Sequence, residues 1–159
     1  MSSNESPQKT VVITDTSCLI ILQKLDLLRV LNGLFDVVLT TPEIMAEYGN
    51  NLPGWIEIMP VNNKTLQKEF SSLVDEGEAS AIALALEIDN QYLITDDLEA
   101  RRLSIKLGLS VIGTLGILLR AKEARLIKYI KPFIAQMRQT NFRVSENLYQ
   151  TILRKANEN

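Results

Sequence analysis

The stretch VVITDTS, residues 11–17, decides the fold, because a β-branched apolar run ends there at a carboxylate, Asp15. A second stretch of the same form, QYLITDD, occupies residues 91–97. Short apolar, β-branched runs bounded by polar turns predict buried strands. In an open α/β sheet, ligands bind beyond the carboxyl ends of the strands. Both acidic turns are therefore expected at one binding edge.

Strand-like and helix-like segments alternate along the rest of the chain. Strands are expected over residues 10–14, 36–40, 55–61, 92–95 and 110–112. Helices are expected over residues 18–24, 27–34, 42–48, 64–73, 78–88, 98–107, 115–122, 128–139 and 145–155. Ser17 and Asp26 are the expected N-caps of the first two helices. Strands separated by helices predict an α/β fold with a parallel central sheet and helices on both faces.

The composition is that of one globular domain. The chain has 159 residues, of which 46% are hydrophobic, and no apolar run approaches the roughly 20 residues that span a bilayer. The single Cys18 permits no internal disulfide and fits a reducing cytoplasm. The polar segment 1–9 is expected to be a disordered lead-in rather than a signal peptide. The absence of His excludes imidazole catalysis and His-ligated metal sites.

The charges are distributed unevenly. Residues 1–100 carry 5 Lys and Arg against 16 Asp and Glu, whereas residues 101–159 carry 12 against 3. Such a chain can pair an acidic, metal-binding cleft with a phosphate-attracting rim, for which the candidates are Lys106, Arg120, Lys122, Arg125 and Lys128. The alternative is that these basic residues simply form the solvated faces of the last helices.

The candidate site consists of acids that follow strands or lie on the neighbouring helices. These are Asp15, Glu47, Glu78, Asp96 and Asp97. Each alone has a structural explanation, as a helix cap, a first-turn carboxylate or an exposed charge. Together they would repel one another unless a hard cation held them, which favours Mg²⁺ or Mn²⁺ bound through oxygen. Candidate helpers are the hydroxyls of Thr16, Ser17, Thr95 and Thr114 and the guanidinium groups of Arg101 and Arg102.

The order of these motifs resembles the PIN-domain ribonucleases. The similar segments are VVITDTS, PEIMAEY, GEASAIALA, LITDDLEARR and VIGT, which together extend over roughly residues 11–124. The chain looks most like the prokaryotic PIN-like branch related to VapC-type toxins. The resemblance implies a single PIN-like domain over residues 10–127, with C-terminal helices over 128–159 that pack on the domain or on a partner.

The resemblance also assigns roles to individual residues. Asp15 is the first metal-binding acid, Ser17 its hydroxyl neighbour and Glu47 the second acid. Glu78 stands where many members of the family have Asp, so the charge is kept on a longer side chain. Either Asp96 or Asp97 supplies the last acid, and the common spacing after the threonine favours Asp97. Thr16, Thr95, Thr114, Arg101 and Arg102 are the expected substrate-binding residues.

The implied activity is hydrolysis of RNA phosphodiester bonds by an endoribonuclease that uses Mg²⁺ or Mn²⁺. Single-stranded RNA is favoured over duplex because unpaired strands bend more readily into a narrow cleft. The implied setting is the toxin component of a toxin–antitoxin pair, a cytoplasmic homodimer inhibited by an antitoxin protein and without a membrane partner.

Three other classes of α/β domain fit the sequence less well. A haloacid-dehalogenase-like phosphatase normally has a second Asp at the position of Ser17, and a receiver domain would need Lys where Leu115 stands. No glycine-rich turn follows the first strand, which excludes a dinucleotide-binding domain. A non-catalytic PIN-like module that binds RNA or a partner protein remains the alternative from another class.

Overall fold

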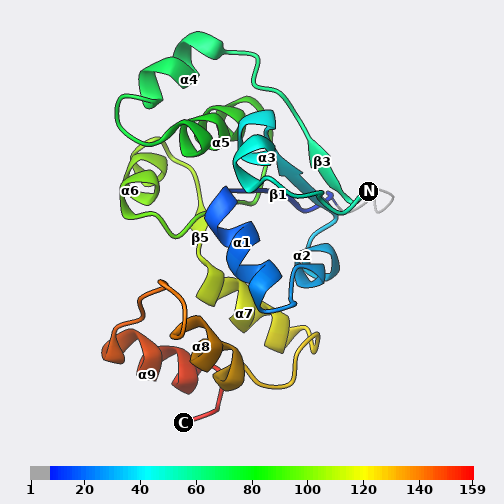
Figure 1. Ribbon diagram of the computed structural model, residues 1–159, viewed down its shortest axis with the longest axis vertical. Coiled ribbons are helices and arrows are strands. Elements are labelled where there is room, and N and C mark those ends of the chain that lie inside the picture. The colour runs from blue at the N-terminus through cyan, green and yellow to red at the C-terminus, as the bar shows by residue number, and fades with distance from the viewer. Residues whose placement is uncertain (1–7) are drawn as a thin grey trace, which may run out of the picture.

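The computed structural model describes residues 8–159, which contain one sheet of five parallel strands in the order β3-β2-β1-β4-β5 (Figure 1). The strands are β1 (Val11–Thr14), β2 (Val37–Thr40), β3 (Ile56–Ile58), β4 (Tyr92–Ile94) and β5 (Val111–Ile112). Most of the lead-in predicted over residues 1–9 lies outside the described residues. The parallel sheet expected from the alternation of elements is confirmed.

Helices cover both faces of this sheet. They are α1 (Thr16–Lys24), α2 (Arg29–Leu34), α3 (Pro42–Tyr48), α4 (Lys64–Phe70), α5 (Glu76–Glu87), α6 (Leu98–Lys106), α7 (Thr114–Glu123), α8 (Lys131–Met137) and α9 (Glu146–Lys155). In Figure 1, α5 lies above the strands and packs on β1 and β4, whereas α1, α2 and α7 lie below them. The chain adds β2 and β3 on one side of β1 and then returns to add β4 and β5 on the other side. Because crossovers between parallel strands are right-handed, this change places the helices that precede β2 and those that precede β4 on opposite faces of the sheet.

Pairing between β1 and β4 brings the two acidic turns side by side. Thr14 is the register partner of Ile94, and the backbone N–H of Asp15 donates to the carbonyl of Ile94 over 3.1 Å. Both strands are central and lie in the hydrophobic core, with Val12, Ile13 and Leu93 almost fully buried. The sheet therefore fixes the relative position of the two turns through backbone hydrogen bonds and apolar packing.

Two expected helix caps were wrong. The N-cap of α1 is Asp15 rather than Ser17, and its carboxylate accepts from the backbone N–H of Cys18. Asp26 does not cap α2, which begins later, at Arg29; its backbone takes a left-handed conformation with φ of 57°. Asp tolerates this conformation better than most residues, so Asp26 forms the turn between the two helices.

The C-terminal helices extend the core. Ile130, Ile134, Met137, Ile152 and Leu153 are buried, and α9 packs on α7. The division of the chain into a domain over residues 10–127 and C-terminal helices stays a prediction. Within residues 8–159, none of the helices combines the length and the apolar character needed to cross a membrane.

Candidate active site

Asp15 is the most deeply buried carboxylate of the candidate site, with 2% of its surface exposed. Its Oδ1 accepts from the backbone N–H of Cys18 over 2.9 Å. Its Oδ2 is also buried but accepts no hydrogen bond from residues 8–159. The pKa of Asp15 is raised to about 6, chiefly by burial and to a lesser extent by the nearby charge of Asp96, while hydrogen bonding from Cys18 and Thr95 opposes the shift. A buried carboxylate oxygen without a donor is costly unless a cation or a proton satisfies it.

Glu78 lies close to this carboxylate, in the first turn of α5. Burial raises the pKa of Glu78 to about 8, and the negative charges of Asp75, Asp97 and Asp15 contribute in the same direction. The three acids that affect Glu78 are each the N-cap of a helix: Asp15 caps α1, Asp75 caps α5 and Asp97 caps α6. Of these, the sequence placed Asp15 and Asp97 at the carboxyl edge.

Asp96 and Asp97 have different surroundings. Both oxygens of Asp96 are occupied: Oδ1 accepts from the backbone N–H of Thr114 over 3.0 Å, and Oδ2 accepts from the Thr114 hydroxyl over 2.6 Å and from the Cys18 thiol over 3.3 Å. Asp97 is exposed and uses only Oδ2, to cap α6 through the N–H of Ala100 over 2.9 Å. Asp96 thus holds the start of α7 against β4, while Asp97 keeps Oδ1 free of hydrogen bonds within the described residues.

Glu47 lies near the C-terminal end of α3, where its Oε1 accepts from the Thr16 hydroxyl over 3.1 Å. The same oxygen lies against the backbone of Gly77, where a Cβ would come within 1.9 Å of it. A glycine is therefore needed at the first turn of α5 for Glu47 to approach it. This contact and the bond to Thr16 connect Glu47 to both neighbouring helices of the site.

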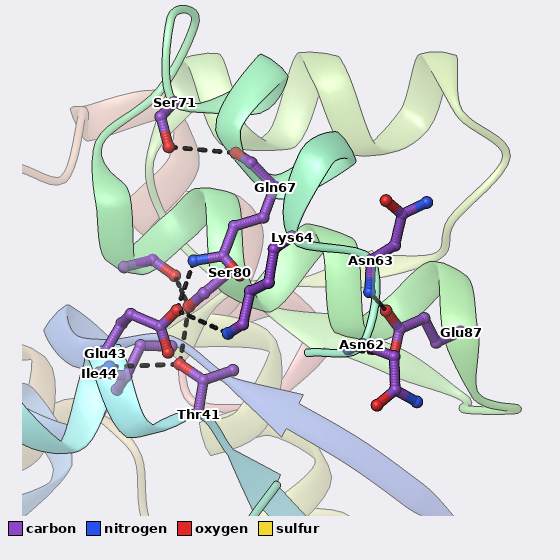
Figure 2. A network of polar contacts seen from close by, with 11 residues as sticks. Thr41, Glu43, Ile44, Asn62, Asn63, Lys64, Gln67, Ser71, Ser80 and Glu87 are labelled. Atoms are coloured by element: carbon purple, nitrogen blue, oxygen red, sulfur yellow. Dashed lines mark hydrogen bonds and ion pairs between the residues drawn. The ribbon is translucent and has the colours of Figure 1, made fainter. Parts of the chain in front are cut away.

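A polar network behind the acids joins α3, α4 and α5 (Figure 2). The Thr41 hydroxyl donates to the Ser80 hydroxyl over 2.6 Å, and Ser80 donates to the carbonyl of Gly77 over 2.6 Å. Glu43 accepts from the amide of Gln67 and lies 3.6 Å from the ammonium group of Lys64, as Figure 2 shows. These bonds fix the start of α5, and hence Glu78, relative to the helix that carries Glu47.

The remaining candidate residues differ in how close they lie to the acids. Thr95 is buried and its hydroxyl accepts from the N–H of Asp97 over 3.2 Å, while Ser17 is exposed. Arg101 donates to the carbonyl of Thr95 over 3.0 Å, beside the acids. Arg102 is exposed and pairs with Glu99 over 3.0 Å, on the outer surface of α6. Among the hydroxyls and guanidinium groups expected to help, the structure brings Thr16, Thr95, Thr114 and Arg101 to the acids.

The predicted basic rim does not line the site. Arg120 lies over the ring of Tyr92, the first residue of β4, at 4.8 Å. Lys122 pairs with Glu158 over 2.9 Å. A helix that follows a parallel strand runs back along the sheet, so the last turn of α7 lies toward the amino ends of the strands. The sequence pattern could not show this, because it does not report the direction in which each helix presents its charges.

The acids lie near one another but do not form a preassembled metal site. Within residues 8–159, no three acidic or thiol side chains are spaced so that they already hold a metal ion. Nevertheless the donor set is all oxygen, as Mg²⁺ and Mn²⁺ prefer. The orphaned Oδ2 of Asp15 and the raised pKa of Glu78 are what such a cation would relieve. The residues present therefore fit an oxygen-ligated divalent ion.

These pKa shifts predict that the metal-free protein becomes less stable as the pH rises. Folded Asp15 and Glu78, with pKa values of about 6 and about 8, hold protons more tightly than the unfolded chain does. Their stabilising contribution is complete below about pH 4 and is lost as the pH passes about 6 and then about 8. We expect the melting temperature in EDTA to fall between about pH 5 and about pH 9, and millimolar Mn²⁺ to restore it. A flat or rising profile would contradict this.

Three contributors to the site were missed in the sequence. Asp75 caps α5, and its spacing to Glu78 is that of a capping box, a signal that was available. Gly77 permits the approach of Glu47, and Cys18 donates its thiol to Asp96. Burial raises the pKa of the Cys18 thiol well above its ordinary value, so it is a neutral donor. No local pattern predicts these last two contacts, because each joins segments distant in the chain.

Comparison with known proteins identifies a family for the chain. The family model DUF3368, described as a PIN domain, matches residues 11–158. The match includes the C-terminal helices as well as the sheet. A search of curated proteins found no match to the chain.

Proposed function

The chain belongs to the PIN-domain family, and from this membership we propose that it is a metal-dependent endoribonuclease. PIN domains are typically nucleases and generally use divalent metals, so a hydrolase acting on phosphodiester bonds is the coarse function. The observation that carries the finer proposal is that Asp15 and Glu78 lie near enough to interact electrostatically and that burial disfavours the ionised form of each. Acids with strongly shifted pKa values are candidates for a functional site, and the carboxyl edge of a parallel sheet is where ligands bind.

Asp15, Glu78 and Asp97 are the residues that would hold Mg²⁺ or Mn²⁺. When bound, the ion acts as a Lewis acid that makes water a stronger nucleophile and stabilises charge on a phosphoryl oxygen. Asp15 is oriented by the N–H of Cys18, and Asp97 by the N–H of Ala100. Each cap leaves one carboxylate oxygen without a hydrogen bond from the described residues, and these oxygens are the proposed ligands.

Other residues position the substrate and the acids. Glu47, held by Thr16, orients the attacking water or supports a second ion. Arg101, held by the carbonyl of Thr95, contacts a phosphate of the substrate. Thr114 keeps Asp96 in place, and the exposed Ser17 follows Thr16 in the chain.

Asp97 and Asp96 are expected to respond differently to removal of their charge. Asp97→Asn retains a good N-cap, so the fold is kept while cleavage falls about a hundredfold from the loss of a ligand. Asp96→Asn loses an acceptor for the Thr114 hydroxyl and costs about 1 kcal/mol of unfolding free energy. Thermal melting and cleavage rates of both variants check this. Equal effects of the two substitutions on both quantities would contradict the assignment.

We further propose that the protein is the toxin component of a toxin–antitoxin pair, related to the VapC-type branch. This extension rests on the order of motifs such as VVITDTS and LITDDLEARR. It implies an RNA substrate, an antitoxin protein that covers the site, a homodimer and a cytoplasmic location. A single cysteine, Cys18, is compatible with a reducing cytoplasm. Induced expression is expected to stop growth, and Asp15→Asn to relieve the arrest.

The proposed activity is tested by incubating the full chain with a mixed pool of single-stranded RNAs, with the matching DNA and with duplex RNA. We expect cleavage of single-stranded RNA in Mn²⁺ or Mg²⁺ and none in EDTA. RNA bound but never cut, in all metals and by well-folded protein, would favour the non-catalytic module instead. Cutting that persists in EDTA would contradict the metal dependence.

A further inference from the structure

A groove of ≈ 700 Å³ adjoins the candidate site at Asp96. One wall comes from the turn after β4 and from α6 and contains Asp96, Leu98 and Arg101. The opposite wall comes from the segment joining α8 to α9 and from α9 itself, which lie on the same side of β5 and α7 as α6 does (Figure 1). The volume falls within the range of about 300–1,000 Å³ typical of ligand pockets. Because Asp96 lines the groove and Asp97 follows it directly in the chain, the groove adjoins the candidate active site.

Arg101 presents a fixed guanidinium group to this groove. Its Nη1 is anchored on the carbonyl of Thr95 over 3.0 Å, and the side chain is partly buried. Although Asp96, Asp97 and Glu99 lie nearby in the sequence, Arg101 forms no ion pair within residues 8–159. A guanidinium carries five N–H donors in one plane, so most of them are left for an anion.

The opposite wall combines a second cation with apolar surface. Arg143 lines the groove, is exposed and takes part in no ion pair in the described part of the chain. Next to it, Phe142 is partly buried, and Leu148 has 43% of its surface exposed. The backbone N–H of Phe142 donates to the Thr140 hydroxyl over 3.1 Å, which fixes this segment on the end of α8.

We propose that the groove binds the part of a single-stranded RNA that flanks the scissile phosphate. Arg101 and Arg143 contact backbone phosphates, while Phe142 and Leu148 receive an unpaired base. The combination of cations and an aromatic ring is the one that binds single strands, since phosphates and base faces are recognised together. A protein segment would leave both arginines without anionic partners unless it were acidic. The inference rests on the proposed nuclease function and assigns substrate binding to the C-terminal helices.

The test is the affinity of the full-length protein, in EDTA, for a fluorescent single-stranded RNA of about a dozen nucleotides, measured by anisotropy at several salt concentrations. Arg143→Gln is expected to raise the dissociation constant about fivefold and to lower the salt slope by about 0.7, as for one lost phosphate contact. Phe142→Leu, which keeps the apolar packing, is expected to weaken binding about tenfold through lost stacking. Arg154→Gln is the matched control, because Arg154 is an exposed arginine of α9 outside the groove, and is expected to change affinity less than about twofold.

Equal effects of Arg143→Gln and Arg154→Gln, or no binding of RNA at all, would overturn the proposal. So would a Leu148→Asp variant that changes the oligomeric state but not the affinity for RNA, since the groove would then be a protein interface. The proposed nuclease activity and the proposed RNA groove can be contradicted independently. If RNA is bound through Arg143 but never cleaved, only the nuclease activity is contradicted. If RNA is cleaved but Arg143→Gln leaves the affinity unchanged, only the role of the groove is contradicted.

Discussion

Asp15→Asn is expected to abolish RNA cleavage and, at the same time, to stabilise the metal-free protein. Asn caps helices about as well as Asp, so the bond from the N–H of Cys18 is retained. The substitution removes a carboxylate whose burial raises its pKa to about 6. A pKa shift of roughly two units corresponds to about 3 kcal/mol of unfolding free energy above pH 7. Part of this gain in stability is lost because the new amide N–H₂ group is buried.

The expected net gain is about 1–2 kcal/mol, or an increase of about 3–6 °C in melting temperature in EDTA at about pH 8. The cleavage rate is expected to fall at least about a thousandfold, since the first ligand of the cation is lost. Asp89→Asn, at an exposed position before β4, serves as the control and changes neither quantity. A variant that melts lower than the wild type and still cleaves would show that Asp15 is only a helix cap.

Glu78→Gln is expected to lower cleavage about a hundredfold and to flatten the dependence of stability on pH. Glu78 is the acid whose pKa rises furthest, to about 8, and it is surrounded by three other carboxylates. Removing its charge therefore removes the decline in stability between about pH 6 and about pH 9, although its partial exposure moderates the size of the change. Cleavage assays and melting curves in EDTA at several pH values measure both effects.

The neighbouring Glu76→Gln is the matched control for Glu78. Glu76 lies in the same first turn of α5 but is exposed. It should leave cleavage and the slope of stability against pH unchanged. Identical behaviour of the two variants would mean that the first turn of α5 carries only a favourable charge near the helix N-terminus, and would remove Glu78 from the proposed site.

The sequence predicted the sheet well because the information is local. Residues 11–14 and 92–94 are mostly apolar and rich in β-branched and aromatic side chains, and they form two neighbouring inner strands. The edge strand was expected over residues 55–61 but extends only over Ile56–Ile58, because only Ile56 of these three is buried. An alternating pattern at an edge gives little packing that would extend a strand.

The site was predictable only in part. The motif order placed Asp15, Glu78 and Asp97 at one edge, and the raised pKa of Glu78 depends in part on the other two acids. The choice of Ser17 as a cap was wrong because two good caps stand almost adjacent in DTS, and only the geometry of the strand end selects Asp15. The bonds of Asp96 to Thr114 and Cys18 join three segments, so no single stretch of sequence contains them.

Mn²⁺ titration by calorimetry near pH 7 tests most directly whether Asp15, Glu78 and Asp97 share a divalent cation. We predict that the wild type binds Mn²⁺ with release of protons, because the cation competes with protons for Asp15 and Glu78. Comparing buffers with different ionisation enthalpies measures that release. Asp15→Asn should bind at least about tenfold more weakly, and Asp89→Asn like the wild type. Wild-type protein that binds no Mn²⁺, or an Asp15→Asn variant that binds it equally well, would contradict the account.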